Sequence, residues 1–304
     1  MDELTLVAAL RRYEYNDAIF DEQPHGGLIL KIAHYEGALL TAMRAMLTSR
    51  AYDVCEMSPS SYLIALQAGA PLIGLPIFPF RQYALGQLVV REDSAMVNVE
   101  DLGRASTIAV RTWAQPTALW ARHYLTDYLG IDLGDVRWMF SADDPVPNLR
   151  RPEGAIDRRG ESLESLLLSG AADAVIGLRE VPQGCRKLID DPVGAAAKWT
   201  RDTGVVPANH LMVIDARHRD TSVPDLVCHR FETVLREYLD SGVPASGVIG
   251  DLKRINPSLD PLPNGRKANA LMWETLVAAM VKQGMIAPVA DPMALLYDWE
   301  PANG

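Results

Sequence analysis

The chain has 304 residues, of which 48% are hydrophobic and 22% charged, and this balance predicts a folded globular protein rather than a disordered one. Its length exceeds the needs of one ordinary core and suits two lobes. The formal net charge of −10, without a run of Lys or Arg, argues against nucleic-acid binding. Because the overall field is negative, an acidic ligand must find positively charged groups inside a pocket.

The N-terminus and the cysteines predict a cytoplasmic protein. Met1 to Leu4 carries acidic residues where a signal peptide needs basic ones. No segment approaches the roughly 20 apolar residues of a membrane span. The cysteines are odd in number and lack CxxC spacing, which argues against a disulfide framework and a structural zinc site. They are Cys55, Cys185 and Cys228.

The first part of the chain alternates strand and helix patterns. Leu4 to Leu10 is an apolar run that ends in the charged, aromatic loop Arg11 to Glu14, as expected of a buried strand that enters a site-forming loop. Gly27 to Ala33 is predicted as a second strand. Apolar residues recur with a helical period over Glu36 to Leu47.

A third strand is predicted over Val54 to Met57, and the next helix begins directly after it. Ser58 suits the N-cap position and Pro59 the first turn. Strands that alternate with helices are typical of an α/β fold with a largely parallel sheet.

One segment of the sequence recurs later in the chain. Leu47 to Val54 is echoed by Leu167 to Ala174, so that Asp53 and Asp173 are 120 residues apart. Each copy reads as the end of a helix, a Ser-x-Ala-x-Asp turn and the start of an apolar strand. The echo favours two similar α/β lobes, although two ordinary helix–turn–strand junctions could also resemble each other by chance.

The middle of the chain is predicted to form the second lobe. Gln87 to Arg91 is an extended segment that enters it, and Ser106 to Val110 is its first strand. The segment after Thr117 is an amphipathic helix that extends through Leu129. The proline-interrupted stretch from Asp144 to Gly160 is expected to be a loop.

The chain is then predicted to return to the first lobe along His210 to Ile214. The remainder, from about Pro224, is mainly helical and is expected to pack on that lobe. These assignments give a discontinuous lobe one, residues 1–90 and 213–304, and a lobe two, residues 91–212.

Several segments carry recognisable motifs: Glu56 to Tyr62, Pro76 to Arg81, Asp101 to Gly103, Trp113 to Trp120, and Thr203 to Pro207 with His210. Together these motifs resemble the 4,5-dihydroxyphthalate decarboxylase family. The resemblance spans about Tyr13 to Ile214 and implies a two-lobed, α/β, type 2 periplasmic-binding-protein-like fold with a ligand cleft between the lobes. It implies a cytoplasmic enzyme that removes a carboxylate from a hydroxylated aromatic acid without an organic cofactor.

The sequence also departs from the pattern of that family. An Arg-His pair follows the Phe-Pro-x-Arg motif in the family, whereas the corresponding stretch here, Gln82 to Leu85, places Ala84 and Leu85 there. An early Arg of the N-terminal loop is replaced near Tyr15. Two anion partners are therefore missing, and the substrate need not be a phthalate.

Two helix starts are candidate substrate-binding segments. Ser58, Ser60 and Ser61 offer hydroxyls and free backbone N–H groups that suit a carboxylate or phosphate, although a plain helix cap explains them equally well. Thr112 to Thr117 occupies the equivalent place in lobe two. There, Trp113, Gln115 and Thr117 are the candidate contacts, with Trp113 either stacked on an aromatic ligand or buried in the core.

Arg81, His210 and Glu56 are the candidate catalytic residues. Arg81 lies in an apolar segment and would clamp a carboxylate, or else form a salt bridge with Glu56 or Asp53. His210 is the candidate proton donor, with a structural, hydrogen-bonded histidine as the alternative. Glu56 would face the cleft or orient a neighbour. Tyr13 and Tyr15 are candidate contacts from the N-terminal loop.

The sequence predicts neither a metal nor a cofactor. His229 and Glu232 have HxxE spacing but no evident third ligand. No phosphate-binding or nucleophile-elbow motif is present. The predicted function is cofactor-independent decarboxylation of a hydroxylated aromatic acid. The alternatives are a dehydratase on the same fold and a non-catalytic receptor or sensor for small acids. Assembly into a homo-oligomer stays open.

Overall fold

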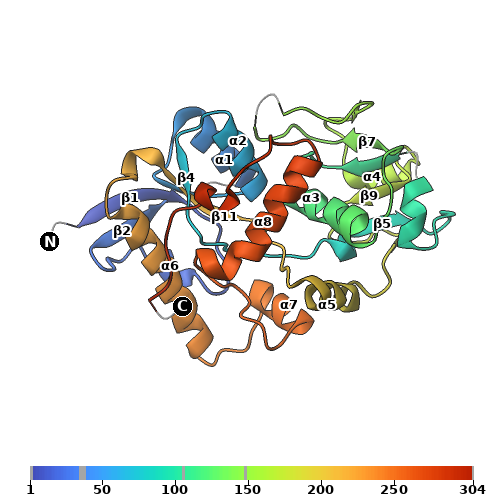
Figure 1. Cartoon of the computed structure of the whole chain (residues 1–304). Helices are drawn as coiled ribbons and strands as arrows, with labels where there is room; N and C mark the ends of the chain where they lie inside the picture. The colour runs from blue at the N-terminus through green and yellow to red at the C-terminus, as the bar shows by residue number, and fades with distance from the viewer. Residues whose placement is uncertain (1–2, 34–38, 105–106, 147–148, 303–304) are drawn as a thin grey trace. The chain divides into compact units, whose positions relative to one another are not determined.

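The structure, a computed structural model, describes residues 3–33, 39–104, 107–146 and 149–302. The chain divides into two compact units, whose elements are labelled in Figure 1. Unit 1 comprises Met1–Arg81, Ala208–Val277 and Ile286–Gly304, and unit 2 comprises Gln82–Pro207 and Ala278–Met285.

The unit boundaries lie earlier in the chain than residues 90 and 212, where the sequence placed them. The strand over Leu88–Arg91 hydrogen-bonds to strands of unit 2 on both sides, so the chain has already left unit 1 before it. Arg81 and Ala208 form an antiparallel bridge within unit 1, at the two points where the chain leaves and re-enters it. The assignment of Ala278–Met285 to unit 2 was not anticipated.

Unit 1 contains a five-stranded sheet in the order β2-β1-β3-β11-β4. Strands β1, β2 and β3 are parallel, whereas β11 lies antiparallel between β3 and β4. The strands are short apolar runs, as expected of a sheet covered by helices. Their bounds are Leu4–Ala9 (β1), Leu28–Ile32 (β2), Val54–Met57 (β3), Leu72–Gly74 (β4) and Leu211–Asp215 (β11).

The helices of unit 1 follow from capping residues and an apolar face. Ser58 caps α2, with Pro59 at its first position, as the sequence predicts. One face of α6 carries Val223, Val227 and Phe231 into the hydrophobic core beneath the sheet. The bounds are Leu39–Ser49 (α1), Pro59–Gln67 (α2), Val223–Asp240 (α6), Gly247–Ile255 (α7) and Arg266–Lys282 (α8), the last of which ends in unit 2.

Unit 2 contains a six-stranded sheet in the order β10-β5-β9-β6-β7-β8. Strands β6 to β9 are parallel, and β5 lies antiparallel between β9 and β10. This repeats the arrangement of unit 1, where an antiparallel strand separates the parallel strands from an edge strand. The bounds are Leu88–Arg91 (β5), Thr107–Val110 (β6), Arg137–Phe140 (β7), Ile156–Asp157 (β8), Ala174–Ile176 (β9) and Cys185–Lys187 (β10).

The helices of unit 2 are α3 (Pro116–His123), α4 (Leu163–Leu168) and α5 (Pro192–Thr203). The helix expected to run through Leu129 is α-helical only to His123 and continues as a π-helical turn over Tyr124–Tyr128. Gly204, at φ 73°, ends α5 in the left-handed conformation that glycine favours. Short 3-10 turns lie at Asp17–Ile19, Leu85–Gln87, Val99–Arg104, Ala216–His218 and Pro292–Leu295.

The two aspartates of the sequence echo have the same structural role in separate sheets. Asp53 accepts a hydrogen bond from the backbone N–H of Val7 at 2.8 Å, and Asp173 accepts one from Thr107 at 2.9 Å. Each carboxylate thereby joins the start of its own strand, β3 or β9, to the neighbouring parallel strand, β1 or β6. The echo therefore marks the same helix–turn–strand junction, used once in each unit.

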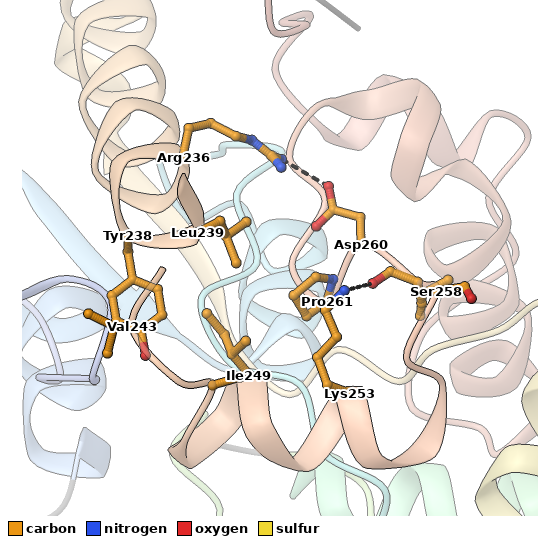
Figure 2. A pocket seen from close by; sticks show the side chains of 11 residues that line it. Arg236, Tyr238, Leu239, Val243, Ile249, Lys253, Ser258, Asp260 and Pro261 are labelled. Carbon is orange, nitrogen blue, oxygen red and sulfur yellow. Dashed lines mark hydrogen bonds and ion pairs between the residues drawn. The ribbon is translucent and has the colours of Figure 1, made fainter. Parts of the chain in front are cut away.

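The C-terminal helices of unit 1 surround a hollow of about 350 Å³ (Figure 2). Its charged side chains bind within the protein: Arg236 pairs with Asp260 at 2.9 Å, and Lys253 donates to the Leu259 carbonyl at 2.9 Å. Leu239 and Ile249 are among its apolar lining residues. Among the described residues, no helix is long and apolar enough to cross a membrane.

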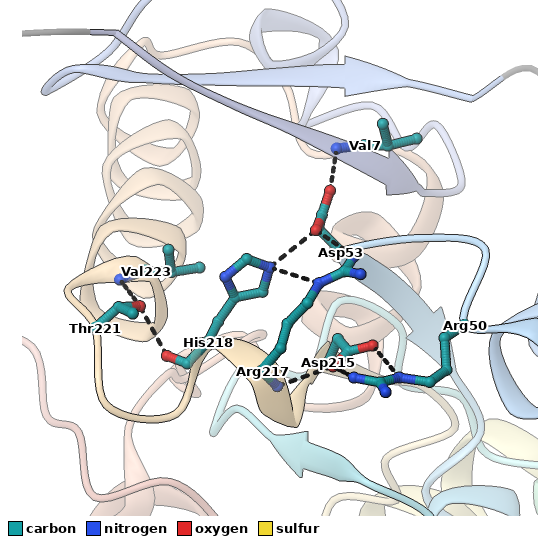
Figure 3. Close-up of polar contacts among 8 residues, drawn as sticks. All are labelled: Val7, Arg50, Asp53, Asp215, Arg217, His218, Thr221 and Val223. Carbon is teal, nitrogen blue, oxygen red and sulfur yellow. Dashed lines mark hydrogen bonds and ion pairs between the residues drawn. The ribbon is translucent and has the colours of Figure 1, made fainter.

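An ion-pair network joins β1, β3 and the end of β11 (Figure 3). Asp53 accepts from His218 at 2.8 Å and from Arg217 at 2.5 Å. The fully buried Asp215 accepts from Arg50 at 2.6 Å and from the backbone of Arg217 at 2.9 Å. Burial raises the pKa of both carboxyls, but these hydrogen bonds outweigh it and lower both pKa values below the ordinary range.

We expect Asp215→Asn to lower the free energy of unfolding by roughly 1–3 kcal/mol at pH 7, because it leaves Arg50 without its carboxylate. A carboxyl with a lowered folded-state pKa stabilises the protein above its unfolded pKa, and this stabilisation is lost as the pH falls through the folded value. The difference from the wild type should therefore persist to about pH 4 and shrink below it. Urea unfolding between pH 7 and pH 3 measures it.

The exposed ion pair of Asp251 with Arg254 supplies the matched control. Asp251→Asn should change the free energy of unfolding much less, since exposed pairs contribute little. Equal effects of the two substitutions would show that burial of Asp215 confers no advantage.

Candidate functional site

A buried carboxylate, Glu56, organises the candidate site of unit 1. It lies near the carboxyl end of β3, opposite Met212 of β11, and is 1% exposed. Its Oε2 accepts the backbone N–H of Arg11 at 2.9 Å. Its Oε1 accepts the Tyr13 hydroxyl and lies 2.5 Å from Nδ1 of His210. These three donors compensate for the loss of water around the carboxylate.

His210 is oriented by contacts on both sides. Its backbone N–H donates to the Phe80 carbonyl at 3.1 Å, and the two rings lie 4.9 Å apart. A carboxylate can only accept a hydrogen bond, so the contact with Glu56 places a proton on Nδ1. Nε2 is then the nitrogen that can exchange a proton with a ligand. The side chain is 15% exposed, so a small molecule can reach it.

Tyr13 and Tyr15 belong to an aromatic wall beside this pair. The Tyr13 ring stacks on Tyr15 at 5.6 Å and on Phe80 at 5.9 Å. Burial, together with the adjacent Glu56 carboxylate, raises the pKa of Tyr13 well above its ordinary value, so the phenol stays protonated and donates to Glu56. Burial also raises the pKa of Tyr15, whose hydroxyl donates to the Pro79 carbonyl at 2.6 Å.

The three candidate serines lie directly after the strand that carries Glu56. Ser58 accepts the backbone N–H of Ser61 at 3.2 Å and donates to the Ser61 hydroxyl at 2.6 Å. The Ser60 hydroxyl lies 3.4 Å from that of Ser58, and all three side chains are buried. The structure therefore places these hydroxyls in the cap of α2.

Arg81 binds the side chain of Asn269 on α8. It is 3% exposed, donates to the side-chain oxygen of Asn269 on α8, and lies over the Phe78 ring at 5.4 Å. Asn269 in turn donates to the Gly265 carbonyl at 2.7 Å. The guanidinium is thus bound in the interior of unit 1. Ala84 and Leu85, where the family has polar residues, are buried at the start of unit 2.

The candidates of lobe two lie at the start of α3 in unit 2. Trp113 is 6% exposed, packs edge-on against Trp138 at 5.4 Å, and has the Arg122 guanidinium 3.7 Å from its ring centroid. Burial lowers the pKa of Arg122 to about 9, which still leaves it charged at pH 7. Gln115 is the N-cap residue of α3 but makes no side-chain cap bond, and Thr117 is half-buried.

Two residues of the site were not singled out from the sequence. Arg11 follows β1, with its guanidinium 5.5 Å from the ring centroids of both Tyr13 and Phe80. Phe80 was quoted only as part of a motif. Arg11 could have been identified from the sequence, because it is a charged residue at the end of a predicted strand and lies two positions before the candidate Tyr13. In the described part of the chain, no three His, Cys, Asp or Glu side chains gather as a metal site requires.

Two solved structures with a similar fold are solute-binding proteins. The periplasmic aliphatic sulphonate-binding protein of Escherichia coli matches with a TM-score of 0.56 and 12% identity over 97% of both chains. The alkanesulfonate-binding protein of Xanthomonas axonopodis pv. citri, bound to MOPS, matches with a TM-score of 0.54 and 14% identity over 98% of this chain and all of that one. The chain therefore has a two-lobed, type 2 periplasmic-binding-protein-like α/β fold, as the sequence predicts.

Curated relatives identify a nearer relationship, whereas no family model matches the chain. The 4,5-dihydroxyphthalate decarboxylase of Comamonas testosteroni is 31% identical over 177 residues, 53% of each protein. That of Pseudomonas putida is 33% identical over 165 residues, 49% of this chain and 64% of the relative. The match thus spans between half and two thirds of these relatives' length. The chain is a divergent relative of the 4,5-dihydroxyphthalate decarboxylases.

Proposed function

We propose that this protein is a carboxy-lyase that removes a carboxylate from a hydroxylated aromatic acid, with 4,5-dihydroxyphthalate as the first candidate substrate. The relationship to proteins of that name supports the proposal. The observation that carries it is the 2.5 Å contact between Glu56 and Nδ1 of His210, which leaves Nε2, at a partly exposed position, as the nitrogen that can carry a proton to a ligand.

The reaction requires a proton at the ring carbon that bears the carboxylate. A hydroxyl ortho or para to that carbon supplies electron density to the ring, and Nε2 of His210 gives its proton to the carbon. The bond to the carboxylate then breaks, its electron pair restores the aromatic ring, and CO2 leaves. This step requires a ring that carries a proton on both nitrogens, and Nδ1 of that ring faces the Glu56 carboxylate. A carboxylate and a proton thus become a C–H bond and CO2, without an oxidant or a reductant.

The experiment is a panel of aromatic acids, measured for CO2 release and for thermal stabilisation of the protein. We expect CO2 release from 4,5-dihydroxyphthalate or a close analogue, after chelation with EDTA and without added nucleotide, flavin or pyridoxal phosphate. Turnover lost on chelation and restored by a divalent metal would contradict the proposed chemistry. Stabilisation by acids without CO2 release would instead favour a binding protein, the role named for the sulphonate-binding structures.

A further inference from the structure

Arg11 lies at the same carboxylate as His210 but on the opposite oxygen. Its backbone N–H binds Oε2 of Glu56, whereas Nδ1 of His210 lies against Oε1. The guanidinium of Arg11 and the ring of His210 both flank Phe80, at 5.5 and 4.9 Å from its ring centroid. One cation and one proton donor therefore lie beside the same aromatic wall.

The guanidinium of Arg11 is positioned by aromatic faces. It lies 5.5 Å from the ring centroids of both Tyr13 and Phe80, and the residue is only partly exposed. Within residues 3–33, 39–104, 107–146 and 149–302, no carboxylate pairs with it. Contact with aromatic rings does not use the N–H groups of a guanidinium, so those of Arg11 are able to bind a carboxylate through two parallel hydrogen bonds.

The neighbouring Arg12, unlike Arg11, has a carboxylate partner. Its guanidinium pairs with Asp17 at 3.5 Å, lies over Phe20, and is 63% exposed. Arg81, the carboxylate clamp expected from the sequence, is buried against Asn269. Arg11 is thus the arginine whose guanidinium lies at the rings of Tyr13 and Phe80, while its backbone N–H binds Glu56.

We propose that Arg11 binds a carboxylate that remains on the substrate, so that the site selects aromatic dicarboxylates over monocarboxylates. This inference rests on the proposed decarboxylation. A cation at the departing carboxylate would oppose the reaction, because that group loses its negative charge as CO2 forms and the cation would stabilise the ground state more than the transition state. A cation at a retained carboxylate has no such cost and fixes the orientation of the ring.

The test measures the binding of phthalate and benzoate by calorimetry, since neither carries the hydroxyl that decarboxylation requires. The wild type should bind phthalate roughly ten- to a hundredfold more tightly than benzoate, the range expected of one charge-assisted contact. Arg11→Gln should abolish this preference, and Arg11→Lys, which keeps the charge without the planar fork, should restore part of it. Arg12→Gln, the matched control, should retain it.

The kinetic arm uses whichever acid of the panel releases CO2. Arg11→Gln should raise KM for it by a similar factor and change kcat much less. A wild type without preference for phthalate, or an Arg11→Gln variant with native circular dichroism that keeps the preference, would overturn the inference. If no acid releases CO2 but the preference exists and depends on Arg11, the proposed activity fails and the carboxylate site stands.

Discussion

His210→Gln should reduce the turnover of bound substrate by roughly 10²- to 10⁴-fold while leaving ligand affinity nearly unchanged. Glutamine keeps an N–H donor that can reach the Glu56 carboxylate, so the buried charge retains a partner. It has no proton to give at neutral pH, so the ring carbon loses its acid. Single-turnover CO2 release separates this loss from binding, which calorimetry measures on the same variant.

His229 supplies the control for this substitution. It is exposed on α6, where its ring contacts Trp299, and it takes no part in the site. His229→Gln should leave both turnover and affinity as they are. If His210→Gln instead destroys affinity and spares the turnover of bound substrate, His210 is a binding residue and the proton has another source.

Glu56→Gln should reduce kcat by roughly ten- to a hundredfold with little change in KM, because a charge-assisted hydrogen bond is worth about 1.5–3 kcal/mol. The carboxylate accepts from Arg11, Tyr13 and His210, whereas the amide turns a donor toward at least one of them. Glu56 is a positioning residue, since it acts through the imidazole. Glu56→Asp, which keeps the charge, should recover part of the rate.

The double variant tests whether Glu56 acts through His210. In the His210→Gln background, Glu56→Gln should cost little further turnover, since the group that it supports is already gone. Independent losses that multiply would show that Glu56 contributes to the reaction by another route. Denaturant unfolding of each variant identifies a loss of turnover that comes from a loss of folded protein.

The elements around the site could be predicted because their signals are local. A four-residue apolar run followed by Ser58 and Pro59 predicts a strand, a cap and a helix start, and β3 and α2 have these bounds. The π-helical turn at Tyr124–Tyr128 was missed because the apolar pattern of five residues does not distinguish a π-helical turn from an α-helical one. No local signal in the sequence indicates that Ala278–Met285 belongs to unit 2, since the boundary before Ala278 lies within the helix α8.

The contacts of the site could not be predicted, because they join residues that are far apart in the sequence. Glu56 and His210 were both chosen by residue type, but the 2.5 Å contact between them joins positions 154 residues apart and depends on the pairing of β3 with β11. Asn269, the partner of Arg81, is 188 residues away on α8. Neither the hydrophobic periodicity nor the spacing of polar residues near Arg81 indicates that Asn269 is its partner. Residue chemistry could therefore identify candidates, whereas the long-range pairing of strands and helices decides which of them meet.

The antiparallel strand β11 has a consequence for biosynthesis. It lies between β3 and β4, yet the ribosome completes β3 at Met57 and β4 at Gly74 long before it reaches Leu211. At 5–20 residues per second, the nascent chain waits roughly 10–30 s during which the edges of β3 and β4 that pair with β11 stay open. Unpaired edges invite association with other chains. Unit 2, most of which is one continuous segment ending at Pro207, can form its sheet during that interval. The strand on which Glu56 lies is therefore completed only when β11 pairs with it.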